Sequence, residues 1–124
     1  MALTGTKFTT AIGGTTTTVT NTNVQTTYLY SPNLSINTGS NTIQFNTSRT
    51  SGTLAGTVTL QGSLDAVNWV TPVETAVSFV DGATQVSPIL TTKRYLYYRL
   101  AITTSGTVVA VTEAYILEDK DPIS

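Results

Sequence analysis

Cysteine and histidine are both absent from the chain. The absence of cysteine excludes a disulfide framework, a thiol nucleophile and cysteine-ligated zinc. Without histidine, the chain also lacks the commonest metal ligand and the commonest general base at neutral pH. At 124 residues, it is nevertheless long enough to form one domain around a core that needs no disulfide.

Charge is scarce as well. Only 10% of the residues are charged, and the net charge is −1. Nucleic acid is therefore not an expected partner, because its recognition needs a dense footprint of lysine and arginine. The six basic residues form no run, and Lys93, Arg94 and Arg99 are predicted to lie on a solvated strand face.

Long apolar segments are missing too. No run reaches the length that spans a membrane, so a membrane is not an expected partner. The first residues contain no basic stretch followed by an apolar segment, and so do not resemble a secretory signal. We expect synthesis in a cytoplasm, with release by lysis if the protein leaves the cell.

Threonine is the abundant residue and makes up almost a quarter of the chain. Threonine is β-branched and suits a half-exposed pleated surface, and its hydroxyl keeps that surface soluble without charge. Such a composition is typical of extracellular and particle-forming β proteins rather than of cytoplasmic enzymes.

Alternation of apolar and polar residues recurs along the chain, and no stretch has a helical period. The pattern predicts an all-β fold, an antiparallel two-sheet β-sandwich of the jelly-roll type with about eight or nine short strands. Residues 48–52 are predicted to form a polar turn. Hairpins are predicted to pair residues 54–64 with 69–73, and residues 94–102 with 108–117. The predicted strands are residues 24–30, 34–36, 42–47, 54–64, 69–73, 77–80, 85–90, 94–102 and 108–117.

Three regions follow from this pattern. Residues 1–23 are rich in threonine and glycine and form either a loose first strand or an arm that orders against a neighbouring subunit, the first being favoured. Residues 24–117 form the sandwich, and residues 118–124 form an acidic tail. The core is predicted to contain one face of each long strand, namely Val58, Leu60, Leu96, Tyr98, Leu100, Val109, Val111 and Leu117.

The acidic residues offer no catalytic pair. Asp65, Glu74 and Asp81 are the only acids in the middle of the chain, and each lies in or beside a predicted turn. Glu118, Asp119 and Asp121 lack the spacing of a calcium loop. Because there is no phosphate-binding glycine loop and no nucleophile elbow either, we expect no catalytic residue, no metal, no cofactor and no enzymatic activity.

One segment, Gly62–Trp69, resembles a known signature. Its Ser63-Leu64-Asp65-Ala66-Val67-Asn68-Trp69 is similar to the Ser-x-Asp-Gly-x-x-Trp hairpin of discoidin-like, galactose-binding-like jelly rolls and of many small virion proteins of tailed bacteriophages, with Ala66 in the glycine position. Residues 93–100 resemble the Arg-Tyr-x-Arg strand of the same sandwiches. Together the two segments span roughly the C-terminal half of the chain, and the resemblance implies a jelly roll.

Two functions remain open at this point. The first is a virion structural protein of a bacteriophage, in the capsid, neck or tail, with copies of itself and other virion proteins as partners. The second is a carbohydrate-binding module. Trp69, Tyr95 and Tyr97 are the candidate interaction residues, although packing of Trp69 across its own hairpin is the favoured interpretation.

Overall fold

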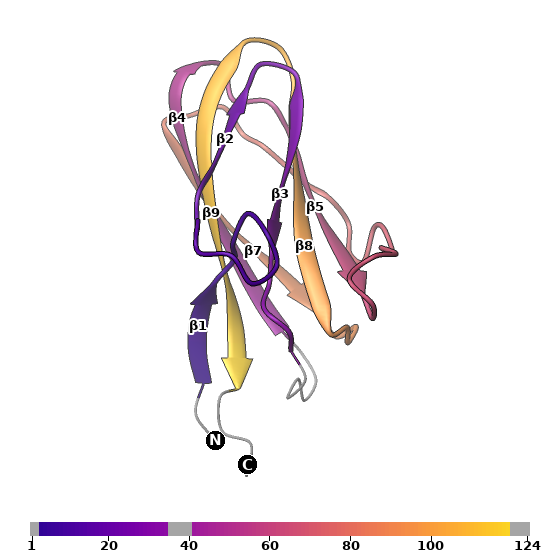
Figure 1. Cartoon of the computed structure of the whole chain (residues 1–124). Coiled ribbons are helices and arrows are strands. Elements are labelled where there is room, and N and C mark those ends of the chain that lie inside the picture. The colour runs from indigo at the N-terminus through magenta and orange to yellow at the C-terminus, as the bar shows by residue number, and fades with distance from the viewer. Residues whose placement is uncertain (1–2, 35–40, 120–124) are drawn as a thin grey trace.

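The chain folds into two facing antiparallel sheets (Figure 1). The structure is a computed structural model, and it describes residues 3–34 and 41–119. The described residues contain nine strands and no helix, which confirms the predicted all-β sandwich. The strands are β1 (Leu3–Lys7), β2 (Val19–Thr22), β3 (Gln25–Tyr30), β4 (Asn41–Gly52), β5 (Gly56–Ser63), β6 (Val77–Ser78), β7 (Thr84–Thr91), β8 (Tyr97–Thr104) and β9 (Val108–Asp119).

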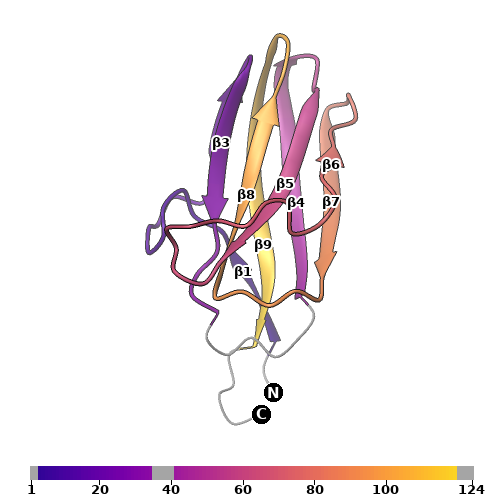
Figure 2. The same cartoon turned by 90° about the vertical axis from the view of Figure 1, so that its right-hand side faces the viewer.

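Each sheet collects strands that are distant in sequence. The five-stranded sheet has the order β1-β9-β4-β7, and β2 also pairs with β9. The four-stranded sheet has the order β3-β8-β5-β6 and lies in front of the other in the view of Figure 2. The connections β2–β3, β4–β5, β6–β7 and β8–β9 all pass from one sheet to the other, so most of the pairing is between distant segments.

The predicted C-terminal hairpin is wrong. β8 belongs to the four-stranded sheet and β9 to the five-stranded sheet, so the turn at Ser105 and Gly106 crosses the sandwich. Both strands have a buried face, and the two faces lie on opposite sides of the same core. Two alternating segments joined by a short turn can pair with each other in one sheet, or they can lie in the two facing sheets. The alternation is the same in both cases, so the sequence does not distinguish them.

Two other boundaries differ from the prediction. Residues 48–52 continue β4 instead of forming a turn, with an irregular register between Arg49 and Ser51. The predicted return strand 69–73 is reduced to one bridge between Gly62 and Val70. The predicted strand 34–36 lies mostly outside the described residues, and Leu34 itself is buried without belonging to a strand.

The core confirms half of the predicted residues. Val58, Leu60, Tyr98 and Leu100 are all buried. The other four are wrong, because Leu96 and Leu117 are each 37% exposed and Val109 and Val111 are half-buried on the outer face of β9. The inner face of β9 carries mainly small residues, so it is no more hydrophobic than the outer face. The inner residues are Val108, Ala110, Thr112, Ala114 and Ile116.

The N-terminal region pairs with its own domain. β1 and β2 both lie beside β9, and the N–H of Phe8 donates to the carbonyl of Ala114 at 2.9 Å. Phe8 is fully buried in the core. β1 and β2 are therefore strands of the five-stranded sheet, and the choice between a first strand and an arm stays a prediction that truncation tests.

A buried polar network ties β2 to the four-stranded sheet. The side-chain amide of Asn21 donates to the carbonyls of Ile102, at 3.0 Å, and Gln25, at 3.1 Å. The Thr27 hydroxyl donates to the Asn21 side-chain oxygen. Because Asn21 is only 1% exposed, these bonds offset the cost of removing its amide from water.

Candidate functional site

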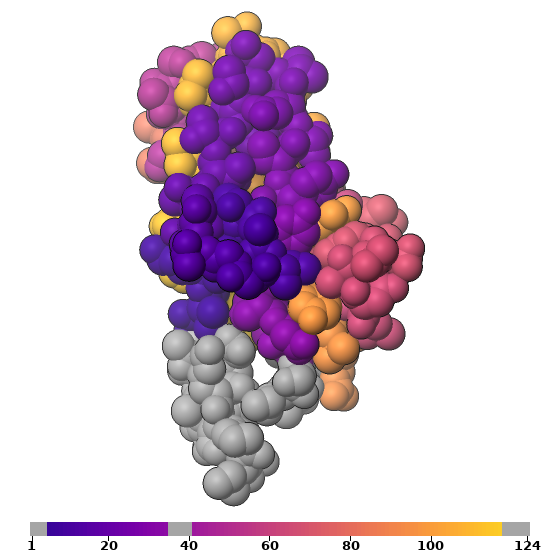
Figure 3. All heavy atoms as spheres, viewed as in Figure 1, coloured from indigo at the N-terminus to yellow at the C-terminus, as the bar shows by residue number. Residues whose placement is uncertain are grey.

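The segment after β5 forms the tight turn that its sequence predicts. The backbones of Gly62 and Val70 exchange hydrogen bonds of 3.1 and 2.8 Å across it. The Asp65 carboxylate accepts the N–H groups of Val67, at 2.9 Å, and Asn68, at 2.8 Å. In the space-filling view the residues that follow β5 project from the side of the molecule (Figure 3).

The centre of the turn is polar. The Ser63 hydroxyl accepts the Ala66 N–H at 2.9 Å and itself donates to the Asn68 carbonyl at 2.6 Å. Ala66 stands where the similar hairpins have glycine, and its φ of 62° lies in the left-handed region that favours glycine. Hydrogen bonds from Asn68 and Val67 hold the pKa of the Asp65 carboxyl well below its usual value, since they stabilise the charged form.

This turn places Trp69 beside three residues of the four-stranded sheet. The guanidinium carbon of Arg99 lies 4.4 Å from the centroid of the Trp69 ring and 4.3 Å from that of Tyr28. Tyr30 packs edge-on against Trp69, with 5.8 Å between the ring centroids. All four side chains are half-buried. We call Tyr28, Tyr30, Trp69 and Arg99 the aromatic–arginine cluster; in Figure 2 the segment after β5 crosses toward β3.

Strand register builds the cluster. Arg99 on β8 stands directly between Tyr30 on β3 and Gln61 on β5. Tyr28 is opposite Ala101, which places it diagonally to Arg99, within reach of a long side chain. The Nε–H of Arg99 donates to the Gln61 side-chain oxygen, and the Gln61 amide donates to the Thr71 hydroxyl at 3.2 Å. The guanidinium is therefore held both by rings and by a side-chain network.

The three candidate interaction residues do not form one site. Trp69 packs beyond its own hairpin, on Arg99 and Tyr30. Tyr95 is half-buried against the core and packs edge-on to Tyr98, at 6.0 Å between centroids. The Tyr97 hydroxyl accepts a hydrogen bond of 3.1 Å from the Asn33 amide.

Sequence reasoning missed Tyr30 and Arg99 as partners of Trp69, and it also missed Tyr28 and Gln61 as partners of Arg99. Arg99 was expected on a solvated strand face, but it is half-buried between two rings. The available signal was the pair of tyrosines at alternate positions of residues 25–30, which share a sheet face. Their proximity to β8 depended on the pairing of distant strands.

A second surface has a different character. The outward residues of β7 include Val86, 63% exposed, and Leu90, 66% exposed, with Pro88 between them. Their neighbours on β4 are uncharged too. We call this surface the β4–β7 face; it consists of Thr42, Gln44, Asn46, Ser48, Thr84, Val86, Pro88 and Leu90.

Proline 88 also affects the free edge of β7. The N–H of Arg49 donates to the Ala83 carbonyl, so every second residue of β7 from Ala83 onward bonds to β4. Pro88 belongs to the alternate set, whose backbone points to the free edge of the sheet. The missing N–H of Pro88 therefore interrupts the edge that another strand would use.

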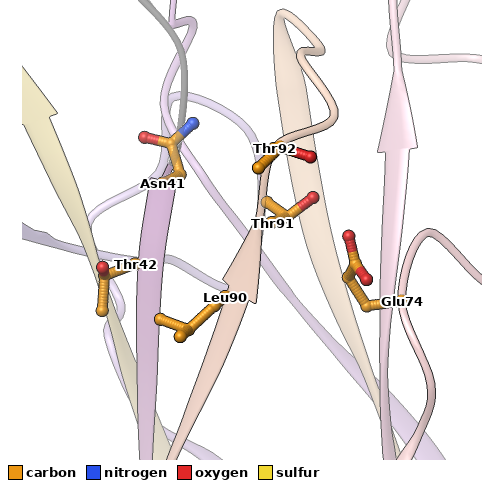
Figure 4. A pocket seen from close by; sticks show the side chains of 6 residues that line it. All are labelled: Asn41, Thr42, Glu74, Leu90, Thr91 and Thr92. Carbon is orange, nitrogen blue, oxygen red and sulfur yellow. The ribbon is translucent and has the colours of Figure 1, made fainter.

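An open pocket of ≈ 410 Å³ lies at the end of β7 (Figure 4). It is lined by Asn41, Thr42, Glu74, Leu90, Thr91 and Thr92. Glu74 is its one titratable side chain, and that carboxylate lies 3.8 Å from the Lys93 ammonium. The lining therefore holds no pair of acids with which to catalyse hydrolysis.

The other acids are spread over the fold, and Glu113 pairs with Lys7 in the middle of β9. The Asp81 carboxylate accepts the Leu54 N–H at 3.0 Å and pairs with Arg49 at 2.8 Å; these contacts lower the pKa of Asp81. Glu118 and Asp119 end β9, opposite β1, and Asp121 lies outside the described residues. Within residues 3–34 and 41–119, no group of three potential metal ligands comes together. Nor does this part of the chain contain a helix long and apolar enough to cross a membrane.

Comparison with known proteins supports the fold. No protein-family model and no curated protein matches the sequence. Among solved structures, the chain is similar to part of a family GH115 4-O-methyl-α-glucuronidase with specificity for decorated arabinogalactans. The TM-score is 0.53 at 10% sequence identity, over 94% of this chain and 16% of the enzyme. The chain therefore has the fold of a β-sandwich region that spans about a sixth of that enzyme.

Proposed function

We propose that this chain is a non-enzymatic structural protein of a bacteriophage virion, which works by assembling with copies of itself and with other virion proteins. The observation that carries the proposal is the β4–β7 face. This surface combines three exposed apolar residues with uncharged polar ones. None of its own residues carries a charge, and one carboxylate, that of Glu113, lies at its margin, 3.5 Å from the Asn46 amide. Burial of Val86, Pro88 and Leu90 against a neighbour therefore avoids most of the cost of removing charge from water.

The contact we propose is face to face rather than edge to edge. Pro88 leaves the free edge of β7 without a donor in the middle of the strand, so a neighbour's strand cannot form a continuous ladder there. Val86 and Leu90, however, stand on the outer face and are free to pack against a second copy. The low overall charge also fits, since closely packed copies would otherwise repel each other.

The phage assignment is supported by composition and by resemblance. A threonine-rich composition is typical of extracellular and particle-forming β proteins. The segment Ser63–Trp69 resembles the hairpin of small virion proteins, and it has the turn chemistry that the resemblance implies.

Sedimentation velocity with matched variants tests the self-assembly. We expect the double variant Val86→Asp/Leu90→Asp to sediment as a monomer at concentrations where the unmodified chain forms larger species. The control is Val24→Asp, which adds charge at a residue 77% exposed before β3. Both variants should keep the melting temperature nearly unchanged, because exposed substitutions cost little. Equal assembly of all three proteins would contradict the role of the β4–β7 face.

A carbohydrate-binding role is the second candidate, and the aromatic–arginine cluster favours it. Half-buried aromatic rings on a sheet face can stack on sugar rings, and Gln61 and Thr71 supply polar groups beside them. The structurally similar enzyme acts on arabinogalactans. Titration of the protein with neutral oligosaccharides, monitored by the fluorescence of its single tryptophan, tests this role.

A further inference from the structure

Arg99 differs from three other cations of the described residues. Lys7, Arg49 and Lys93 each pair with a carboxylate, at 3.6, 2.8 and 3.8 Å. Arg99 has no carboxylate within ion-pairing distance among the described residues, and its one hydrogen-bond partner there is Gln61. That bond uses Nε, so the two terminal nitrogens retain their donors.

The guanidinium is also fixed in place. Tyr28 and Trp69 lie close to it on the cluster surface, at 4.3 and 4.4 Å, while Gln61 holds Nε. An arginine that is already ordered loses little side-chain entropy when it binds a ligand. Its terminal nitrogens form a planar fork that matches a carboxylate with two parallel hydrogen bonds.

We propose that Arg99 binds the carboxylate of an acidic sugar, with the sugar ring against the neighbouring aromatic side chains. This inference rests on the second candidate function, carbohydrate binding. A sugar is the favoured occupant because the guanidinium is surrounded by three aromatic rings, Tyr28, Tyr30 and Trp69. A sugar ring that carries a carboxylate can offer that group to the guanidinium fork and the C–H groups of one ring face to an aromatic side chain.

The test uses a tetramer of galacturonic acid, a neutral tetramer of galactose and a tetra-aspartate peptide, each titrated into the full chain. Trp69 is the only tryptophan, so its fluorescence reports on this cluster alone. We expect the acidic sugar to bind at least about tenfold more tightly than the neutral sugar or the peptide. Side-chain NMR of the unmodified protein should show the Arg99 Nε resonance shifting on the same isotherm.

Two variants distinguish the contribution of the planar guanidinium fork to binding from that of positive charge alone. Arg99→Lys keeps the positive charge but removes the fork, and should weaken binding of the acidic sugar roughly tenfold. The control is Lys7→Gln, which removes a cation that lies 5.5 Å from the Tyr115 ring on the other sheet; affinity should change less than about twofold. Melting temperatures confirm that each variant is folded.

Each other outcome has a definite meaning. Equal binding of acidic and neutral sugars would overturn the carboxylate inference while leaving carbohydrate binding in place. Preferential binding of the peptide would overturn the sugar as occupant. Absence of binding by all three probes, with no shift of the Arg99 resonance, would overturn both the inference and the second candidate function.

Discussion

The ring of Tyr95 lies directly over the backbone of Gly62. A Cβ atom added to Gly62 would stand 2.4 Å from Cδ2 of that ring, closer than real Cβ contacts come. Because Gly62 has no side chain, the Tyr95 ring can pack against the core at this point of β5. We predict that Gly62→Ala lowers the free energy of unfolding by about 1–3 kcal/mol, because the ring must move out of its site. Urea denaturation measures the change.

Gly82→Ala is the matched control. The nearest atom to a Cβ at Gly82 is 4.0 Å away, and its φ is not in the left-handed region. This substitution should leave stability unchanged or raise it slightly, since alanine restricts the unfolded chain. Equal losses for the two variants would show that the contact with Tyr95 does not decide the cost at Gly62.

The left-handed backbone of Ala66 gives a prediction of opposite sign. Its φ of 62° is unfavourable for a residue with a Cβ atom. We expect Ala66→Gly to stabilise the protein by about 0.5–1 kcal/mol, the relief of strain being partly offset by the flexibility of glycine in the unfolded chain. Ala76→Gly, at an exposed residue without a positive φ, should not stabilise it. A destabilised Ala66→Gly variant would be inconsistent with this account of the turn.

The turn should also make stability depend on acid. The folded-state pKa of Asp65 is lowered, with the Asn68 N–H as the largest cause. Its stabilisation is therefore present above the unfolded pKa of about 3.9 and is lost as the pH falls toward the lower folded value. Asp65→Asn should melt below the unmodified protein at pH 7, and the difference in melting temperature should shrink below about pH 4. A difference independent of pH would mean that the charge of Asp65 does not matter.

Phe8 provides a test of the N-terminal region. It follows β1 in the chain and precedes β2, both of which pair with β9, and its side chain is fully buried. Phe8→Ala should cost about 3–5 kcal/mol, as for other buried aromatic residues, and deletion of residues 1–20 should abolish the cooperative thermal transition. Ile12→Ala, at a residue 42% exposed, is the control and should change little. An unchanged melt of the truncated protein would instead support an arm that orders against a neighbouring subunit.

Features that depend on residues close together in the chain could be predicted from the sequence. Period-2 alternation predicted the all-β sandwich, and the inner residues Leu60 and Leu100 followed from it. The turn at Asp65 was predictable because a carboxylate and two following N–H groups interact within a few residues. These features depend on neighbours in the chain.

Features that depend on the order of strands in each sheet could not be predicted from the sequence. The crossing between β8 and β9 and the burial of Phe8 are set by which sheet each strand joins. The contact of Arg99 with Tyr28 and Trp69 likewise joins three segments that are far apart in the sequence. The outer face of β9 misled the core prediction because its valines are as apolar as the small inner residues.

The oligomeric state of the unmodified protein tests the proposed function most directly. Native mass spectrometry of the full chain, over a wide range of protein concentration, measures it without any substitution. We predict a dimer of the 13.1 kDa chain whose share increases with concentration, because one uncharged, partly apolar β4–β7 face packs on that of a second copy. A monomer at every concentration would contradict self-assembly as the working mode of this protein.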